Sequence, residues 1–263
     1  MAARPILGLV ALFLLAGGIL LQFLVVLSGG INSFPENLIY FLQASTDDIV
    51  PQPRNPSRWT FFAVCGVGDD GHNVNCGDPV PALPFDPTHH TNFNTEDGVP
   101  GEFIDTHYYY NLSRFMFAFY IIALFCSCMT LLVSILAPLS RLGALVSGLG
   151  GMGALFFQIL AASLMTAWTV KGRDAFRAAD LDAKVGVYAM AFTWTSVACF
   201  ALATALFCVA GATGRHRERE PRPSGARGRF GGLFRKKSAR STHSRGSFLD
   251  SESQRRVIKD EYT

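Results

Sequence analysis

The chain has 263 residues, of which 49% are hydrophobic and only 16% are charged, and its mean hydropathy is +0.26. This composition argues against an ordinary soluble protein and indicates a membrane protein. The net charge of +3 averages two opposed regions. Residues 30–112 hold eleven acidic and two basic side chains, whereas residues 215–245 hold eleven basic and two acidic ones.

Four apolar runs are each long enough to cross the hydrocarbon core of a bilayer, which needs about 20 residues. None of the runs contains Asp, Glu, Lys, Arg or His, and we predict transmembrane segments at 5–28, 115–137, 142–167 and 186–210. The first run is far longer than the apolar part of a typical signal peptide, so we expect it to remain uncleaved.

The basic residues set the expected topology, because Lys and Arg favour the cytosolic side of a membrane. The Arg-rich tail should therefore be cytosolic, and four spans place both termini on that side. The predicted layout is a cytosolic N-terminus 1–4, an extracellular loop domain 29–114, a cytosolic turn 138–141, a second extracellular loop 168–185 and a disordered basic tail 211–263.

The first extracellular loop is long enough to fold, and its Pro, Gly, Asn and Asp residues favour short strands joined by turns. The best strand pattern covers residues 59–65, and Asp70-Gly71 is a hairpin turn signal. A turn centred there places Cys65 directly opposite Cys76. Two such cysteines in an oxidising compartment should form a disulfide. Pairing of one of them with a second copy of the chain stays open.

The remaining cysteines lie in the spans. Cys126, Cys128 and Cys199 are interpreted as small apolar packing residues. Cys208, near the cytosolic end of the fourth span, has the same interpretation, with palmitoylation as the alternative.

The end of the first loop offers two candidate modification or metal motifs. His89-His90 lies near Asp86, but adjacent histidines do not converge easily on one ion, so we predict a solvated loop without metal or cofactor. Asn111 begins a glycosylation sequon, although the nearby second span should hinder the transferase. The tyrosines at 108–110 are typical of an aromatic belt at a membrane surface.

The third span carries Gly143, Ser147 and Gly151 at four-residue spacing. Small residues on one helix face allow close helix packing. This packing is expected either within one four-helix bundle or laterally between copies.

The basic tail is the candidate lipid-binding segment. Its basic and large apolar residues include Arg229, Phe230, Phe234, Arg235, Lys236 and Lys237. Each basic residue beside an anionic leaflet contributes about 1 kcal/mol. The alternative is that these charges only enforce topology. Four serines lie near Arg or Lys and are candidate phosphorylation sites, where phosphate would cancel the attraction: Ser238, Ser241, Ser244 and Ser247.

The sequence patterns of enzymes are missing. The glycine-rich run at 148–153 superficially resembles a nucleotide loop, but it lies inside a predicted span without an adjoining strand. The spans contain polar residues such as Gln22 and Gln158 but no ionisable ones, which argues against a coupled transporter. We therefore predict a protein that is not an enzyme and does not bind nucleic acid. A passive pore formed by several copies stays open.

Several motifs together resemble the fungal Sur-seven/PalI family of eisosome-associated plasma membrane proteins, within the claudin-like superfamily. They are the residues 29–32 (GGIN), 42–49 (LQASTDDI), 59–65 (WTFFAVC) with Cys76, and 113–117 (SRFMF). The resemblance covers about residues 1–212. Trp59 and Phe62 carry the extracellular fold signature. Claudins have Gly-Leu-Trp shortly before the first cysteine. Here Thr60-Phe61-Phe62 stands in those positions, and Phe62 supplies the aromatic ring where the motif has Trp.

The resemblance implies an α-helical membrane protein with a left-handed four-helix transmembrane bundle, capped by a small extracellular antiparallel β-sheet. It also implies residence in sterol-rich, furrow-like patches of the plasma membrane. The leading hypothesis is a membrane organiser that self-associates laterally and contacts anionic lipids, sterols, eisosome coat proteins or cell wall components. The first alternative is a subunit of an ambient-pH-signalling complex that uses His72, His89, His90 and His107. The second is a channel-like assembly.

Overall fold

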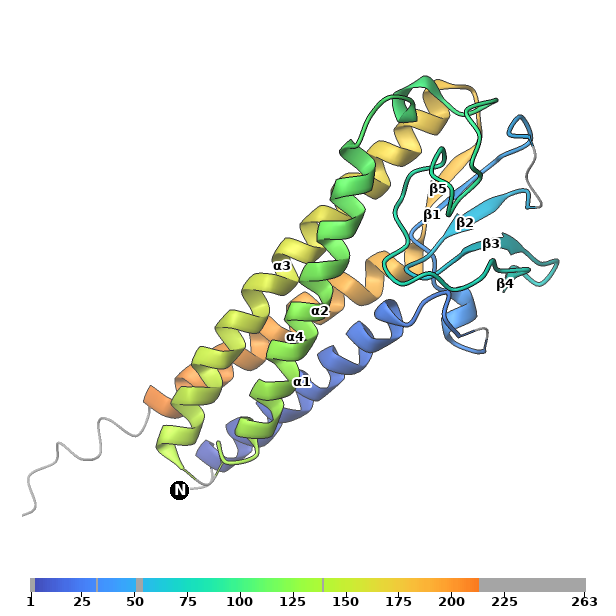
Figure 1. Ribbon diagram of the computed structural model, residues 1–263. Coiled ribbons are helices and arrows are strands. Elements are labelled where there is room, and N and C mark those ends of the chain that lie inside the picture. Colours follow the sequence, from blue (N-terminus) through green and yellow to red (C-terminus); the bar gives the residue numbers. More distant parts are fainter. Residues whose placement is uncertain (1–2, 32, 51–53, 139, 213–263) are drawn as a thin grey trace, which may run out of the picture. The chain divides into compact units, whose positions relative to one another are not determined.

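The computed structural model describes residues 3–31, 33–50, 54–138 and 140–212, which lie in one compact unit. Four long helices dominate this unit (Figure 1): α1 Ala3–Val26, α2 Tyr108–Ser134, α3 Arg141–Ala178 and α4 Val187–Ala212. Each contains a segment that is long and apolar enough to cross a membrane. The fold class expected from the sequence, a four-helix membrane protein with a small antiparallel sheet, is confirmed.

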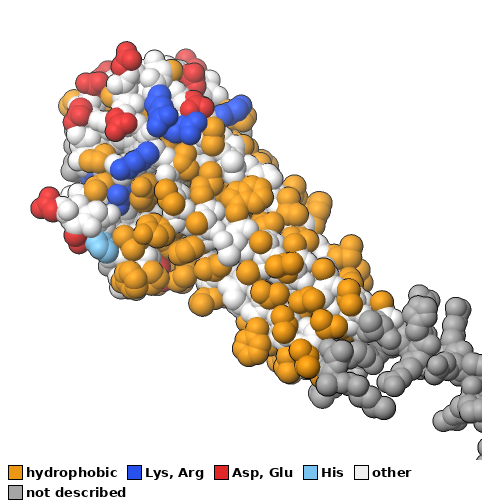
Figure 2. Space-filling view, turned by 180° about the vertical axis from the view of Figure 1, so that it is seen from behind, with side chains coloured by type: hydrophobic (Ala, Val, Ile, Leu, Met, Phe, Trp, Pro, Cys, Tyr) orange, Lys and Arg blue, Asp and Glu red, His pale blue; other side chains and the backbone are white. Residues whose placement is uncertain are grey.

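The helices form a bundle in which α1 and α3 each pack against α2 and α4. The start of α1, the end of α4 and the α2–α3 turn lie at one end of the bundle, and the sheet lies at the other (Figure 1). Many apolar side chains on the bundle surface are exposed, including Phe13, Phe125 and Leu149. Figure 2 shows this apolar covering, with the charged side chains gathered at the sheet end. The distribution is that of a helical bundle surrounded by lipid.

The small-residue face of α3 lies inside the bundle. Gly143, Ser147 and Gly151 are all buried. A Cβ atom on Gly151 would lie 2.6 Å from the Thr204 hydroxyl of α4, and one on Gly143 would lie 2.8 Å from the Leu136 carbonyl of the α2–α3 connection. The structure therefore uses this face for packing within one chain. Contacts between copies would have to use other surfaces.

Two buried hydrogen bonds between side chains cross the bundle, and each joins helices that are not direct neighbours. The Gln22 amide of α1 donates to the Gln158 Oε1 of α3 at 2.8 Å and to the Tyr120 carbonyl at 3.1 Å. The Tyr120 and Thr193 hydroxyls share a 2.6 Å hydrogen bond between α2 and α4. All four side chains are fully buried. Each glutamine keeps one polar atom without a hydrogen-bond partner, Gln22 Oε1 and Gln158 Nε2. The hydrogen-bonding capacity of this buried pair is therefore only partly used.

A double-mutant cycle on the glutamine pair should reveal this coupling. Gln22→Leu alone should destabilise the protein by about 1 kcal/mol, because it leaves the buried Gln158 amide without a partner. The Gln22→Leu/Gln158→Leu double variant should be less destabilised than the sum of the single variants, because no polar group is then stranded. Thermal unfolding of the purified full chain in detergent measures the effect. If the destabilisation of the double variant equalled the sum of those of the single variants, the two glutamines would not be coupled.

One five-stranded antiparallel sheet joins the two loops. Its strands are β1 Leu42–Ala44, β2 Ser57–Trp59, β3 Val64–Val67, β4 Asn73–Val74 and β5 Ala183–Val185, in the order β4-β3-β2-β1-β5. β5 comes from the second loop and pairs with β1 of the first, with Leu42 opposite Val185. Two short 3₁₀ helices, η1 Glu36–Leu38 and η2 Gly101–Phe103, complete the first loop. We call the described residues of 29–107 and 168–186 the sheet-end domain.

The predicted strand at residues 59–65 is wrong. β2 ends at Trp59 and β3 starts at Val64, and Thr60 and Ala63 close a tight turn in which the Thr60 N–H donates to the Ala63 carbonyl at 3.1 Å. The turn carries Phe61 into the core, where its ring lies 5.1 Å from that of Tyr120. Burial of one aromatic ring has overridden the strand propensity of the segment.

The helices at the sheet end are longer than the predicted spans. α3 continues to Ala178, although residues 168–185 were expected to be a loop, and α2 starts at Tyr108 instead of residue 115. The α3 extension is helical because Trp168, Gly172 and Phe176 repeat at four-residue spacing and are buried. They pack against Trp59 and Phe85 of the first loop. That spacing was readable in the sequence.

Candidate functional site

Trp59 on β2 is the centre of the sheet-end domain. It is only 1% exposed. Its ring centroid lies 5.3 Å from Phe85, 5.9 Å from Phe93 and 5.6 Å from Phe176 of α3. Its indole N–H donates to the Asn92 side chain at 3.1 Å. One side chain therefore holds together the sheet, the segment that follows β4 and the α3 extension.

The disulfide between Cys65 and Cys76 is present, as predicted. The hairpin register is different from the expected one. Gly68 and His72 are bonded across the turn, so three residues rather than two lie between them, and the register continues to place Asn75 opposite Cys65. Asn75 has a positive φ of 51° and ends the strand. The chain then continues alongside β3, where the Gly77 N–H donates to the Val64 carbonyl at 3.0 Å, and Cys76 reaches Cys65 from just beyond the strand.

Arg58 connects four parts of the sheet-end domain from a buried position. Its guanidinium donates to Gln43 at 2.9 Å, to the Gly71 carbonyl at 2.8 Å and to the Asn73 side chain at 3.0 Å. It also lies 4.2 Å from the ring centroid of Tyr40. Burial lowers the pKa of Arg58, and Tyr40 opposes this effect. The guanidinium remains charged because its ordinary pKa is so high.

Replacing Arg58 by lysine should destabilise the protein by about 2 kcal/mol, despite the retained charge. A lysine ammonium cannot span the three acceptors that the planar guanidinium reaches together. The apparent melting temperature of the full chain in detergent checks this. The matched control is Arg173→Lys, which alters a partly exposed ion pair with Asp174 and should have little effect. Equal shifts for both variants would contradict the structural role of Arg58.

The surface of the sheet-end domain is acidic. Nine carboxylates of the first loop are exposed: Asp47, Asp48, Asp69, Asp70, Asp78, Glu96, Asp97, Glu102 and Asp105. The two basic residues of the same loop, Arg54 and Arg58, are partly and fully buried. No group of three or more His, Cys, Asp or Glu side chains in the described part of the chain is placed to hold a metal ion. The negative surface would attract cationic partners and repel anionic ones.

Three of the four loop histidines gather around Tyr110 at the start of α2. The ring of His89 lies 4.0 Å from that of His90 and 5.4 Å from that of Tyr110, and His107 lies 6.5 Å from Tyr110. The pKa of His89 is lowered, chiefly by burial and then by His90; Asp86 opposes this and Arg114 adds to it. The fourth, His72, lies in the β3–β4 turn, 3.9 Å from Asp70.

The other predicted sites occupy varied positions. Asn111 is exposed in the first turn of α2, while the Ser113 hydroxyl of its sequon is buried and accepts from the Phe85 N–H at 2.9 Å. Cys208 is exposed on α4, and Cys126, Cys128 and Cys199 are half-buried free thiols. The tail residues proposed for lipid binding and phosphorylation lie outside the described residues: Arg229, Phe230, Phe234, Arg235, Lys236, Lys237, Ser238, Ser241, Ser244 and Ser247.

A family model described as the SUR7/PalI family matches residues 7–206. This range contains the whole sheet-end domain and all of the four helices except the first residues of α1 and the last residues of α4. The chain belongs to the SUR7/PalI family. It is 38% identical over 190 residues to Protein SUR7 of Candida albicans, a match that covers 72% of this chain and 68% of that protein.

Two further SUR7-type relatives are from Saccharomyces cerevisiae. The SUR7 family protein FMP45 is 40% identical over 195 residues, covering 72% of this chain and 60% of its own length. The uncharacterized plasma membrane protein YNL194C is 33% identical over 202 residues, a match that covers 75% of this chain and 65% of that protein. The chain thus spans roughly two thirds of the length of these relatives, from 60% to 68%. The name of YNL194C describes a plasma membrane protein, and none of the three names describes a catalytic family.

Proposed function

We propose that this chain is a non-enzymatic organiser of plasma membrane compartments of the eisosome type. The observation that carries the proposal is the continuity between the sheet-end domain and the bundle. One cluster of buried residues extends from Trp59 and Phe85 to Tyr120, Ala161 and Met165 of the helices. α3 continues unbroken from the bundle into the domain. A contact made by this domain outside the membrane is therefore held rigidly relative to the spans, as a scaffold requires.

The organiser acts by lateral self-association. The small-residue face of α3 is occupied within the chain, so the available surfaces are the exposed apolar faces of the helices and the edge strands β4 and β5. Edge strands carry unpaired backbone groups that can pair with another chain. The exposed aromatic residues of the bundle, such as Phe156 and Trp194, can pack against a second copy.

Cysteine cross-linking in intact membranes tests this assembly. One cysteine at a time replaces Phe13, Phe125, Leu149, Phe156 or Trp194, at native expression and in a background in which the four free cysteines are alanine: Cys126, Cys128, Cys199 and Cys208. Oxidation should give dimer bands for the positions on one face of the bundle. The matched control is Ala161→Cys, which is fully buried on the same helix as Phe156 and should stay monomeric. If every exposed position stayed monomeric, the proposed self-association would be wrong.

The proposed location is static patches of the plasma membrane, with both termini in the cytosol, and the relative YNL194C is named as a plasma membrane protein. The start of α1 and the end of α4 lie at the same end of the bundle, which supports termini on one side. In this proposal the tail binds anionic lipids and the eisosome coat, and the sheet-end domain contacts wall components. Live imaging of the tagged protein should show immobile cortical patches. An even or endosomal signal would contradict the proposal.

A second candidate is a subunit of an ambient-pH-signalling complex, favoured by the histidines around Tyr110. Because the folded-state pKa of His89 is lowered, the neutral ring is favoured in the fold. The stabilisation by the neutral His89 ring is complete above the unfolded-state pKa of about 6.5. It decreases as the pH falls below that value and is fully lost below the lower pKa of the folded state. His89→Asn should remove this acid-side loss in melting curves recorded from pH 7.5 to 5. Unchanged pH-dependent signalling in cells that carry His89→Asn would favour the organiser role.

A further inference from the structure

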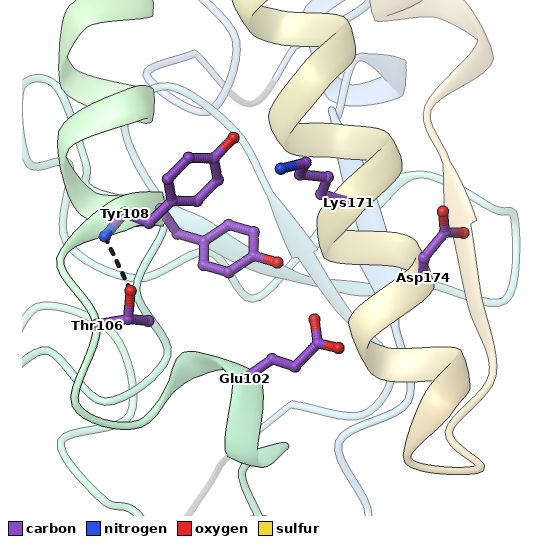
Figure 3. A pocket seen from close by; sticks show the side chains of 6 residues that line it. Glu102, Thr106, Tyr108, Lys171 and Asp174 are labelled. Carbon is purple, nitrogen blue, oxygen red and sulfur yellow. Dashed lines mark hydrogen bonds between the residues drawn. The ribbon is translucent and has the colours of Figure 1, made fainter.

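A pocket of about 390 Å³ opens where the sheet-end domain meets the bundle. Three segments contribute to it: η2, the first turn of α2 with the residues before it, and the α3 extension. The lining residues are Glu102, Thr106, Tyr108, Tyr109, Lys171 and Asp174. In Figure 3, Lys171 extends from α3 toward Tyr108 of α2, and Glu102 extends from η2 into the same space. The volume lies within the range of small-ligand sites.

The pocket carries separated charges of both signs. The Lys171 ammonium lies 4.6 Å from the ring centroid of Tyr108. The Glu102 carboxylate is exposed on η2. The Asp174 carboxylate is bonded to Arg173 at 2.7 Å. Lys171 and the neighbouring Arg173, which lies outside the lining, balance the formal charges of Glu102 and Asp174, so the site combines charges of both signs without a net charge. Such a site suits a ligand that carries both charges itself.

The depth of the pocket matches the headgroup layer of a bilayer. The uncharged segment of α3 extends to Val170, and the hydrocarbon-spanning part predicted from the sequence ends at residue 167. At a rise of 1.5 Å per residue, Lys171 lies about 6 Å and Asp174 about 10 Å beyond that point. The headgroup layer of one leaflet is roughly 5–8 Å thick. With the span end predicted from the sequence, the basic group is expected within this layer and Asp174 at its aqueous boundary.

We propose that this pocket binds the headgroup of a zwitterionic phospholipid from the leaflet at the sheet end. The phosphate is attached to the glycerol, so it is held nearer the acyl chains, at the depth of Lys171. The amine forms the distal end of the headgroup and points outward to Glu102 and Asp174. Each charge of the headgroup then faces an opposite charge of the pocket: the phosphate faces Lys171, and the amine faces Glu102 and Asp174. The inference needs only the bundle's position in a membrane, so it is independent of the organiser role.

The same geometry discriminates against other lipids. An anionic lipid such as phosphatidylglycerol has no amine, so its glycerol head offers no cation to Glu102, and Asp174 keeps only its ion pair with Arg173. A sterol has no phosphate for Lys171. A primary ammonium has three N–H donors for the carboxylates, whereas a choline has none. The expected order of retention is therefore phosphatidylethanolamine, then phosphatidylcholine, then phosphatidylglycerol.

Competition among lipids tests the site. The full chain is equilibrated in detergent with equimolar phosphatidylethanolamine, phosphatidylcholine and phosphatidylglycerol, and native mass spectrometry quantifies the retained lipids. Wild type should retain phosphatidylethanolamine about tenfold over phosphatidylglycerol, the effect of one charge-assisted contact. Glu102→Gln/Asp174→Asn should abolish that preference. Lys171→Gln should lower retention of all three lipids about tenfold.

The controls separate the pocket from general effects. Lys184→Gln removes an exposed charge from β5, outside this pocket, and should bind as wild type. An apparent melting temperature equal to that of wild type shows that each variant is folded. Soluble phosphoethanolamine should compete only weakly, because it lacks the acyl chains; competition at the affinity of the lipid would overturn the assignment to a lipid. Equal retention of all lipids by wild type, or a preference that survives Glu102→Gln/Asp174→Asn, would refute the proposal.

Discussion

Replacing Trp59 by alanine should destabilise the protein by about 3–5 kcal/mol, the range observed when a buried tryptophan is truncated. The indole is 1% exposed and contacts aromatic rings from three segments, including Phe176 of α3. Its removal leaves a cavity at the point where the sheet joins the helix, and it strands the Asn92 side chain. The apparent melting temperature of the full chain in detergent should fall sharply. The segment at 79–100 should become sensitive to protease before the helices unfold.

Two variants make the result specific. Trp59→Phe keeps most of the ring packing and loses the hydrogen bond to Asn92, so we expect a loss of about 1–2 kcal/mol. Trp194→Ala removes a tryptophan that is 46% exposed on the bundle, and its effect should be small. Loss of protease resistance in Trp194→Ala but not in Trp59→Ala would mean that Trp59 does not anchor the domain.

The four spans could be predicted from the sequence because each is a long uncharged run, and membrane insertion depends on that property alone. Their ends could not be placed in the same way. Residues 168–178 are helical outside the predicted span, because one face packs on Trp59 and its neighbours. That stabilisation comes from the tertiary structure, and only the four-residue spacing of Trp168, Gly172 and Phe176 indicates it.

The sheet was only partly predictable. The disulfide could be inferred because Cys65 and Cys76 flank a turn signal. The register could not, since a three-residue turn and a two-residue turn fit the same sequence. β1 and β5 were missed because each has three residues, too few for an alternating pattern, and because about 140 residues separate them.

The candidate headgroup pocket lay beyond sequence reasoning for a related cause. Glu102 lies on η2 of the first loop and Lys171 lies on α3, and their placement around one pocket requires the α3 extension to pass beside η2. Each residue alone is typical of a solvated surface. Their placement at one membrane depth is a property of the fold.

Removing the disulfide should have the second large effect. The Cys65→Ser/Cys76→Ser variant should lose about 3 kcal/mol, because the bond closes a short loop and limits the conformations of the unfolded chain. The two cysteines are 11 residues apart. β4 is an edge strand of two residues and pairs only with β3 in the described sheet. Without the disulfide, its other support comes from side-chain hydrogen bonds, such as that of Arg58 to Asn73. The β3–β4 hairpin should therefore fray first, which hydrogen exchange of residues 64–76 would detect.

Reducing agent provides the matched comparison. Wild type treated with reductant should melt at the temperature of Cys65→Ser/Cys76→Ser, and that variant should not respond to reductant. Cys208→Ser should retain the full response, because Cys208 is a free thiol on α4. Cys65→Ser alone exposes Cys76 as an unpaired thiol, so this variant should form some disulfide-linked dimers that wild type lacks. If wild type itself ran as such dimers, the bond would link two copies of the chain, and the hairpin would owe its stability to assembly.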